Sequence, residues 1–378
     1  MDVFITLITN ALIIFFGYRK LKKVKSILVK LLYIALFIMH NCAFILNYLN
    51  NLKVQKDSYN FYLNALNASK ITDLNFIGSQ FMSVIVFPFV KLGISYFSIS
   101  LIFSTLSLYA FYKYFNHFYK MYKNGNYYYF FFLMLIFLLP SLHYWTAGLT
   151  KEALIFYLMS TVYFQILKEN TNNLIFIIAL LLILLIRPYI FIIILISYIA
   201  FIMINTVKQN KYKIMLLLLS VSFSIIILKK FLKIDEFNIA TIHNRFEHII
   251  DYSSQNGASS IDLKNSNYIS RFFLVLFRPL FYDAKDVFQL WISLENLINL
   301  LLAVIFSYSI LLKNKIKGFF KDNLYVVLST IFLVLFYSIY LYNLGLASRM
   351  RVMFIPYFYI LFLTLFFNNK NYDEEKIN

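Results

Sequence analysis

Seven arginines are the residues of this sequence best suited to bind an anion. A guanidinium is planar, permanently charged and able to hold phosphate through two parallel hydrogen bonds. They are Arg19, Arg187, Arg245, Arg271, Arg278, Arg349 and Arg351. In the helix order predicted below only Arg19 is cytoplasmic, so 7 − 1 = 6 arginines share the outer side. This segregation predicts that the six bind an anionic substrate there, such as a lipid-linked phosphate or diphosphate. The alternative is that each arginine extends to lipid headgroups.

The stretch PSLHYWTAGLTKEA, residues 140–153, carries a second group of polar candidates. His143 is a candidate general base, because the pKa of an unperturbed imidazole, ~6.5, suits proton transfer near neutral pH. Glu152 is a candidate catalytic carboxylate, and Lys151 a candidate substrate-binding cation. Two alternatives are a histidine that only belongs to an interfacial aromatic belt and a local ion pair between Lys151 and Glu152.

Three further residues complete the candidate site. Asp57 and Tyr59 combine an acid with an aromatic ring in a predicted outer loop, a combination used to bind sugars and also common in loops. Glu295 lies about two turns inside a predicted apolar helix, and a charge at such a position needs a partner. Arg278 or Lys285 are the expected partners. Glu295 therefore has either a catalytic role or a structural one.

The sequence predicts neither a metal site nor a cofactor. His243 and His248 are five residues apart and do not share a helical face. Cys42 is the single cysteine, which excludes disulfides and cysteine-based metal sites.

The composition determines the class of protein that must position these residues. Of 378 residues, 61% are hydrophobic and 14% charged, with a mean hydropathy of +0.72. Many apolar runs approach the ~20 residues that cross a bilayer. We therefore expect an all-α polytopic integral membrane protein, with residues 1–378 forming one membrane domain. The net charge of +18 reflects lysines that flank helices, and no nucleic-acid surface is expected.

About eleven membrane spans are predicted. They cover about 3–18, 27–48, 94–114, 127–146, 153–167, 172–186, 189–206, 213–228, 287–312, 323–342 and 352–367. The basic stretch RKLKKVKS after the first span places the N-terminus outside, and the same rule places the C-terminus in the cytoplasm.

The loops follow from this arrangement. Residues 49–75 form the first outer loop, and 229–285 form a long outer loop whose segment 271–282 re-enters the membrane. Residues 76–92 are short and interrupted by Pro88, and are expected to be re-entrant or interfacial. If they crossed the membrane, the later lysine-rich loops would lie outside, against the positive-inside rule.

The outer-facing stretches resemble one family. PSLHYWTAGLTKEAL, LLIRPYI, LFRPLFYDAKDVFQLWISLEN and NLGLASRMRVMFIP look like the Wzy-type polymerases of O-antigen and capsule repeat units. Some members carry an Arg and a Gly separated by ten residues in an outer loop, whereas Arg245 and Gly257 here have eleven between them. The resemblance implies polymerisation of undecaprenyl-diphosphate-linked glycan at the outer face of the bacterial inner membrane. It also implies a chain-length regulator and a flippase as partners.

Three other functions remain open. A polytopic, GT-C-like glycosyltransferase that uses a polyprenyl-phosphate sugar would need an acid in its first outer loop, and Asp57 could serve. A flippase for lipid-linked glycan would need a polar path through the membrane, where Lys30 and Glu295 are the main charges. A purely structural subunit would leave the segregated arginines unexplained.

Overall fold

A computed structural model of the chain describes residues 2–23, 26–54, 57–121, 127–205, 267–312, 316–341 and 343–367, with isolated residues between 206 and 266. The predicted span 213–228, most of the predicted loop 229–285 and Arg245 lie outside the described residues.

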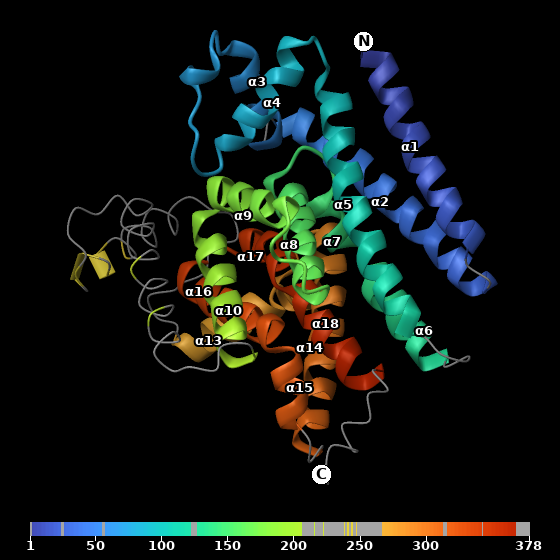
Figure 1. Ribbon diagram of the computed structural model, residues 1–378, viewed down its shortest axis with the longest axis vertical. Coiled ribbons are helices and arrows are strands. Elements are labelled where there is room, and N and C mark those ends of the chain that lie inside the picture. Colours follow the sequence, from blue (N-terminus) through green and yellow to red (C-terminus); the bar gives the residue numbers. More distant parts are fainter. Residues whose placement is uncertain are drawn as a thin grey trace. The chain divides into compact units, whose positions relative to one another are not determined.

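In the described part of the chain every regular element is helical, which confirms the all-α part of the predicted fold class (Figure 1). The α-helices are α1 Asp2–Lys23, α2 Ile27–Val54, α3 Asp57–Asn67, α4 Phe81–Lys91, α5 Tyr96–Met121, α6 Tyr127–Phe137, α7 Pro140–Thr146, α8 Lys151–Leu167, α9 Leu174–Ile186, α10 Pro188–Asn205, α13 Tyr268–Phe277, α14 Val287–Leu312, α15 Ile316–Asp322, α16 Leu324–Tyr340, α17 Leu344–Met350 and α18 Ile355–Phe367. Three 3₁₀ turns accompany them, η1 Ile71–Asp73, η2 Phe281–Asp283 and η3 Arg351–Met353.

Four of the described helices are long and apolar enough to cross a membrane: Ile27–Val54, Tyr128–Thr146, Pro188–Asn205 and Val287–Leu311. A fifth span is possible if Leu344–Met353 and Ile355–Phe366, which meet at 53°, form one bent helix. These helices indicate a membrane protein, but they do not confirm eleven spans. Several predicted spans are shorter than expected; α9, for example, has 13 residues.

The chain folds as two compact units, residues 1–187 (unit 1) and 188–378 (unit 2). In unit 1, α2 packs on α7, and α8 packs on both α5 and α9. Its core contains fully buried Leu36, Ile99 and Ile155. In unit 2, α16 packs on α10, α13 and α18 around buried Tyr337 and Phe362.

The first predicted loop, 49–75, contains helical structure. Helix α2 continues to Val54, and α3 follows after two residues. Ser58, Phe61 and Ala65 are buried in α3, and their spacing of three and four residues makes one face of a helix. This face lets α3 pack on α4.

Helix α4 lies in the segment that was predicted not to span. Its 11 residues rise only about 16 Å at 1.5 Å each, against a hydrocarbon core of about 30 Å. The predicted re-entrant segment 271–282 is also broken, because α13 ends at Phe277, before Arg278 and Pro279.

Candidate functional site

Four of the predicted site residues form two ion pairs in unit 1 that are linked through consecutive residues of α8. The Lys151 ammonium lies 3.4 Å from a carboxylate oxygen of Asp57. The next residue, Glu152, accepts a hydrogen bond from the Arg187 guanidinium. Asp57, Lys151, Glu152 and Arg187 will be called the acid–base chain. It joins the start of α3, the start of α8 and the end of α9.

Exposure changes sharply along the acid–base chain. The Asp57 side chain is 53% exposed and that of Lys151 13%, whereas Glu152 is fully buried and Arg187 is 10% exposed. Two charges removed from water are stable only as a well-bonded pair. The buried pair therefore fixes the first turn of α8, and the neighbouring pair presents an accessible carboxylate.

The turn before α8 explains why the chain takes this path. Gly148 has a φ of +89°, which favours glycine, and an added Cβ would lie 3.2 Å from the side-chain oxygen of Asn47. Asn47 in turn donates to the Tyr144 carbonyl at 3.0 Å. Thr150 then caps α8 by accepting from the backbone N–H of Ala153 at 3.0 Å. Helix α2 thus holds the turn that delivers Lys151 and Glu152.

Arg187 is positioned by the end of a helix. It is the C-cap of α9, its N–H donates to the Ile183 carbonyl at 2.8 Å, and Pro188 follows. A residue before proline is driven out of helical geometry. The sequence predicted that one span ends at 186 and the next begins at 189, and α9 ends at Ile186 while α10 begins at Pro188.

Tyr59 belongs to a cluster of aromatic rings on α3 and α5. Its ring stacks on Tyr62, with centroids 6.2 Å apart, and meets the edge of Tyr96 at 5.1 Å. Tyr96 is buried and its hydroxyl bonds to that of Ser58 at 2.8 Å. Phe61, between these tyrosines in sequence, lies with its ring centroid 5.8 Å from the Lys151 ammonium. Helix α3 therefore carries aromatic rings as well as the exposed acid.

His143 is completely buried within unit 1, and not at a water-facing rim. Its Nε2 lies 2.8 Å from the Phe137 carbonyl oxygen, and its Nδ1 lies 3.1 Å from Nδ1 of His40. The ring of Phe111 stacks on it at 4.2 Å. In this arrangement His143 holds α7 against α2 and is not placed to take a proton from a substrate. His40 was missed because one histidine in an apolar run gives no spacing pattern.

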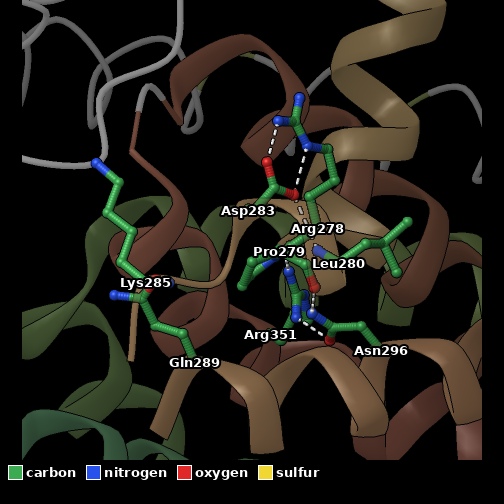
Figure 2. A network of polar contacts seen from close by, with 8 residues as sticks. All are labelled: Arg278, Pro279, Leu280, Asp283, Lys285, Gln289, Asn296 and Arg351. Atoms are coloured by element: carbon green, nitrogen blue, oxygen red, sulfur yellow. Dashed lines mark hydrogen bonds and ion pairs between the residues drawn. The ribbon is translucent and has the colours of Figure 1, made fainter. Parts of the chain in front are cut away.

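A second polar network lies in unit 2, where α13 ends (Figure 2). Arg278 donates to both carboxylate oxygens of Asp283, with a distance of 3.0 Å from Nε to Oδ2. These bonds raise the pKa of Arg278. Burial alone would raise the pKa of Asp283, but the bonds from Arg278 and the Leu280 N–H outweigh it and lower that pKa. The Arg278 side chain remains 32% exposed.

Arg351 occupies the centre of this network (Figure 2). It is buried and donates to the carbonyl oxygens of Val275, at 2.8 Å, and Arg278, and to the side chain of Asn296. Asn296 also donates to the Pro279 carbonyl at 2.6 Å. Arg351 and Asn296 therefore hold the break after α13 in shape. Neither Asp283 nor Asn296 was singled out in the sequence.

The remaining predicted residues of unit 2 lie on the same elements. Glu295 precedes Asn296 in α14, is buried and acts electrostatically on Arg351. Arg349 is half-buried in the last turn of α17, and Arg271 is half-buried in the first turn of α13. The sequence predicted Arg278 or Lys285 as the partner of Glu295. Arg278 is bonded to Asp283. The contact shown for Lys285 is made by its backbone N–H, which donates to the side chain of Gln289 at 2.9 Å.

No group of three or more histidine, cysteine or acidic side chains capable of holding a metal occurs among the described residues. No protein-family model, no curated protein and no solved structure matches the chain.

Proposed function

We propose that this protein is a membrane glycosyltransferase that polymerises undecaprenyl-diphosphate-linked oligosaccharide repeat units into a surface polysaccharide at the outer face of the bacterial inner membrane. The observation that carries the proposal is the acid–base chain. It puts a half-exposed carboxylate and a cation 3.4 Å apart on a buried, paired support. A glycosyl transfer from a diphosphate needs a base for the acceptor hydroxyl and positive charge for the leaving group.

In the proposed step, an acceptor sugar hydroxyl attacks the anomeric carbon of the donor glycan. The new C–O bond forms as the bond to the diphosphate breaks, and the diphosphate leaves with the bonding electrons. Asp57 takes the hydroxyl proton, and Lys151 stabilises the negative charge that develops on the diphosphate. The Glu152–Arg187 pair is a positioning pair, because both side chains are buried against each other.

In unit 2 we assign Arg278 as the residue that binds an anion. Its bidentate pairing with Asp283 fixes the guanidinium plane, and its remaining exposure lets a phosphate oxygen reach it. Arg351 is already bonded to protein acceptors and supports Arg278 through the Arg278 carbonyl.

The test uses substrate from the protein's own host. The gene is deleted, lipid-linked oligosaccharide is extracted from the deletion strain, and the purified full chain is incubated with it in detergent. A ladder of lengthening products is expected from the unaltered protein and none from Asp57→Asn. The absence of any product from the unaltered protein, with stable folded protein present, would overturn the proposal.

A second candidate is a glycosyltransferase that uses a polyprenyl-monophosphate sugar. The observation that favours it is that Asp57 is the first residue of α3 and is separated by two residues from the end of α2, so an exposed acid lies just beyond an apolar helix. In the same assay this enzyme would add one sugar and stop, and it would require a polyprenyl-phosphate sugar as donor. Product length therefore separates the two candidates.

A further inference from the structure

A second cationic position in unit 1, separate from the acid–base chain, lies between α5 and α8, which run side by side (Figure 1). The Lys113 ammonium is surrounded by three aromatic rings. Their centroids lie 5.7 Å away for Tyr109, 5.8 Å for Tyr157 and 5.2 Å for Phe164. Attraction to the faces of these rings helps to hold a half-buried cation here.

The hydrogen bonding of Lys113 is incomplete. An ammonium group has three donors, and one of them reaches the Thr161 hydroxyl at 3.3 Å. No acidic side chain in the described ranges forms an ion pair with Lys113. Two donors and one full positive charge are therefore available to a ligand.

Two further basic residues lie near the ammonium. Lys168, the exposed C-cap of α8, is close enough to repel Lys113 electrostatically. His117 is one helical turn beyond Lys113 on α5, and its ring centroid lies 5.6 Å from that of Phe164. Lys113 and Lys168 carry like charges and form no ion pair with an acid in the described part of the chain, so a bound anion would stabilise both. Lys113, Lys168 and His117, with the three rings, will be called the Lys113 site.

The surroundings select the kind of anion. Tyr109 is 52% exposed, so the Lys113 site opens to the outside of the helix pair and not into the core. Aromatic rings around a lysine are typical of the membrane interface, where one side of a ligand is apolar and the other charged. A phosphate ester on a lipid has both properties.

The Lys113 site is far from the acid–base chain. Lys151 and Lys168 are 168 − 151 = 17 residues apart on α8, which is about 26 Å at 1.5 Å per residue. That is close to the thickness of the hydrocarbon core, about 30 Å. The two cationic positions thus lie at opposite ends of the same helix.

We propose that the Lys113 site binds the phosphate of an anionic lipid headgroup or of a soluble phosphate ester. Lys113 donates to the phosphate oxygens, Lys168 adds long-range attraction, and the rings pack against the adjoining apolar part of the ligand. This site is independent of the function proposed above, because none of its residues belongs to the acid–base chain.

The test is titration of the purified full chain in a neutral detergent, followed by native mass spectrometry. The probes are phosphatidylglycerol, phosphatidylcholine, glycerol phosphate and inorganic phosphate. We expect one phosphatidylglycerol to bind in preference to phosphatidylcholine, and Lys113→Met to weaken it about 10- to 100-fold, the loss of one charged hydrogen bond. Competition by glycerol phosphate at similar concentration would assign the site to soluble esters, and its absence to lipid.

Lys91→Met is the matched control. The Lys91 ammonium also lies over a ring, 5.2 Å from the centroid of Phe87, but it donates to the Leu66 carbonyl at 3.2 Å. This variant should bind as the unaltered protein does. Should Lys113→Met fail to fold, Lys168→Met, at an exposed position, should still weaken binding several-fold. Unchanged binding in both the Lys113 and Lys168 variants that fold would overturn the proposal.

Discussion

Glu152 and Arg187, 35 residues apart, form a hydrogen-bonded ion pair inside unit 1, and the Glu152 side chain has no exposed surface. The pair joins the first turn of α8 to the end of α9. Removing one partner would leave an uncompensated buried charge. Loss of one member of a buried pair can strongly destabilise a protein, even where the whole pair adds little net stability.

The first prediction follows from this asymmetry. Arg187→Met should destabilise the protein by about 3–5 kcal/mol, because Glu152 would remain buried without its cation. Adding Glu152→Gln to that variant should recover most of the loss, since a neutral amide replaces the orphaned charge. Denaturant unfolding in detergent measures both. A double variant as unstable as the single one would show that the lost stability comes from packing of Arg187 and not from its charge.

The second prediction concerns Asp57, the exposed end of the acid–base chain. Asp57→Asn should change stability by less than about 1 kcal/mol, because ion pairs open to solvent contribute little. Its effect on the rate of glycan transfer should be about 10²- to 10⁴-fold, the usual contribution of a general base. The matched control is Asp73→Asn in η1, an exposed carboxylate that accepts from the Lys70 N–H. Full activity in Asp57→Asn would remove Asp57 as the base.

Local sequence patterns predicted the helices well but not the partners of the charged residues. Arg187–Pro188 marked the end of one helix and the start of the next because proline acts on its immediate neighbour. Lys151 and Glu152 are adjacent, and adjacent residues of a helix point in different directions. One therefore reaches Asp57 and the other Arg187, across 94 and 35 residues of sequence. Such partners depend on packing, which composition and periodicity do not determine.

The same distinction explains His143 and Arg351. Each residue looked available for chemistry because the sequence shows its type but not its burial. In the structure His143 faces His40 and a carbonyl, while Arg351 donates to Val275, Arg278 and Asn296. The sequence selected both as polar site residues. Whether they meet a ligand or the chain's own carbonyls could not be decided without the fold.

The third prediction concerns the stability that the buried Arg351 gives to unit 2. Arg351→Lys should lower stability by about 2–4 kcal/mol, since lysine cannot reach three acceptors in different directions and some would be left unsatisfied in the interior. Lower yield of folded protein and a lower midpoint of thermal unfolding are the expected results. Equal stability of Arg351→Lys and the unaltered protein would contradict the role given to this guanidinium.

The fourth prediction tests charge against shape at the proposed anion contacts. Arg278→Lys and Arg349→Lys keep the charge but lose the planar fork. Each should reduce polymer formation about 30- to 1,000-fold, the effect of losing about 2–4 kcal/mol of contact with a leaving group. Arg19→Lys should have no effect, because on the cytoplasmic flank predicted for Arg19 only positive charge is needed. The measurement is a gel of the glycan ladder beside an immunoblot of the membrane fraction. Full ladders from both outer-face variants would make these arginines membrane anchors.

The last prediction tests whether α8 crosses the membrane with the acid–base chain outside. The reactive background is first removed with Cys42→Ser, since Cys42 is the single cysteine and is exposed. Ser69→Cys follows α3, the helix whose first residue, Asp57, pairs with Lys151. Asn172→Cys follows the far end of α8, near Lys168, and both positions are exposed. Because α8 is about 26 Å long at 1.5 Å per residue, a spanning helix puts the two cysteines on opposite sides.

A membrane-impermeant maleimide added to spheroplasts should label Ser69→Cys and leave Asn172→Cys unlabelled until the membrane is opened with detergent. Labelling of Asn172→Cys alone would invert the orientation and place the acid–base chain in the cytoplasm, where the proposed glycan donor is not presented. Labelling of both in intact spheroplasts would mean that α8 does not cross, and the membrane-spanning role of this helix would have to be abandoned.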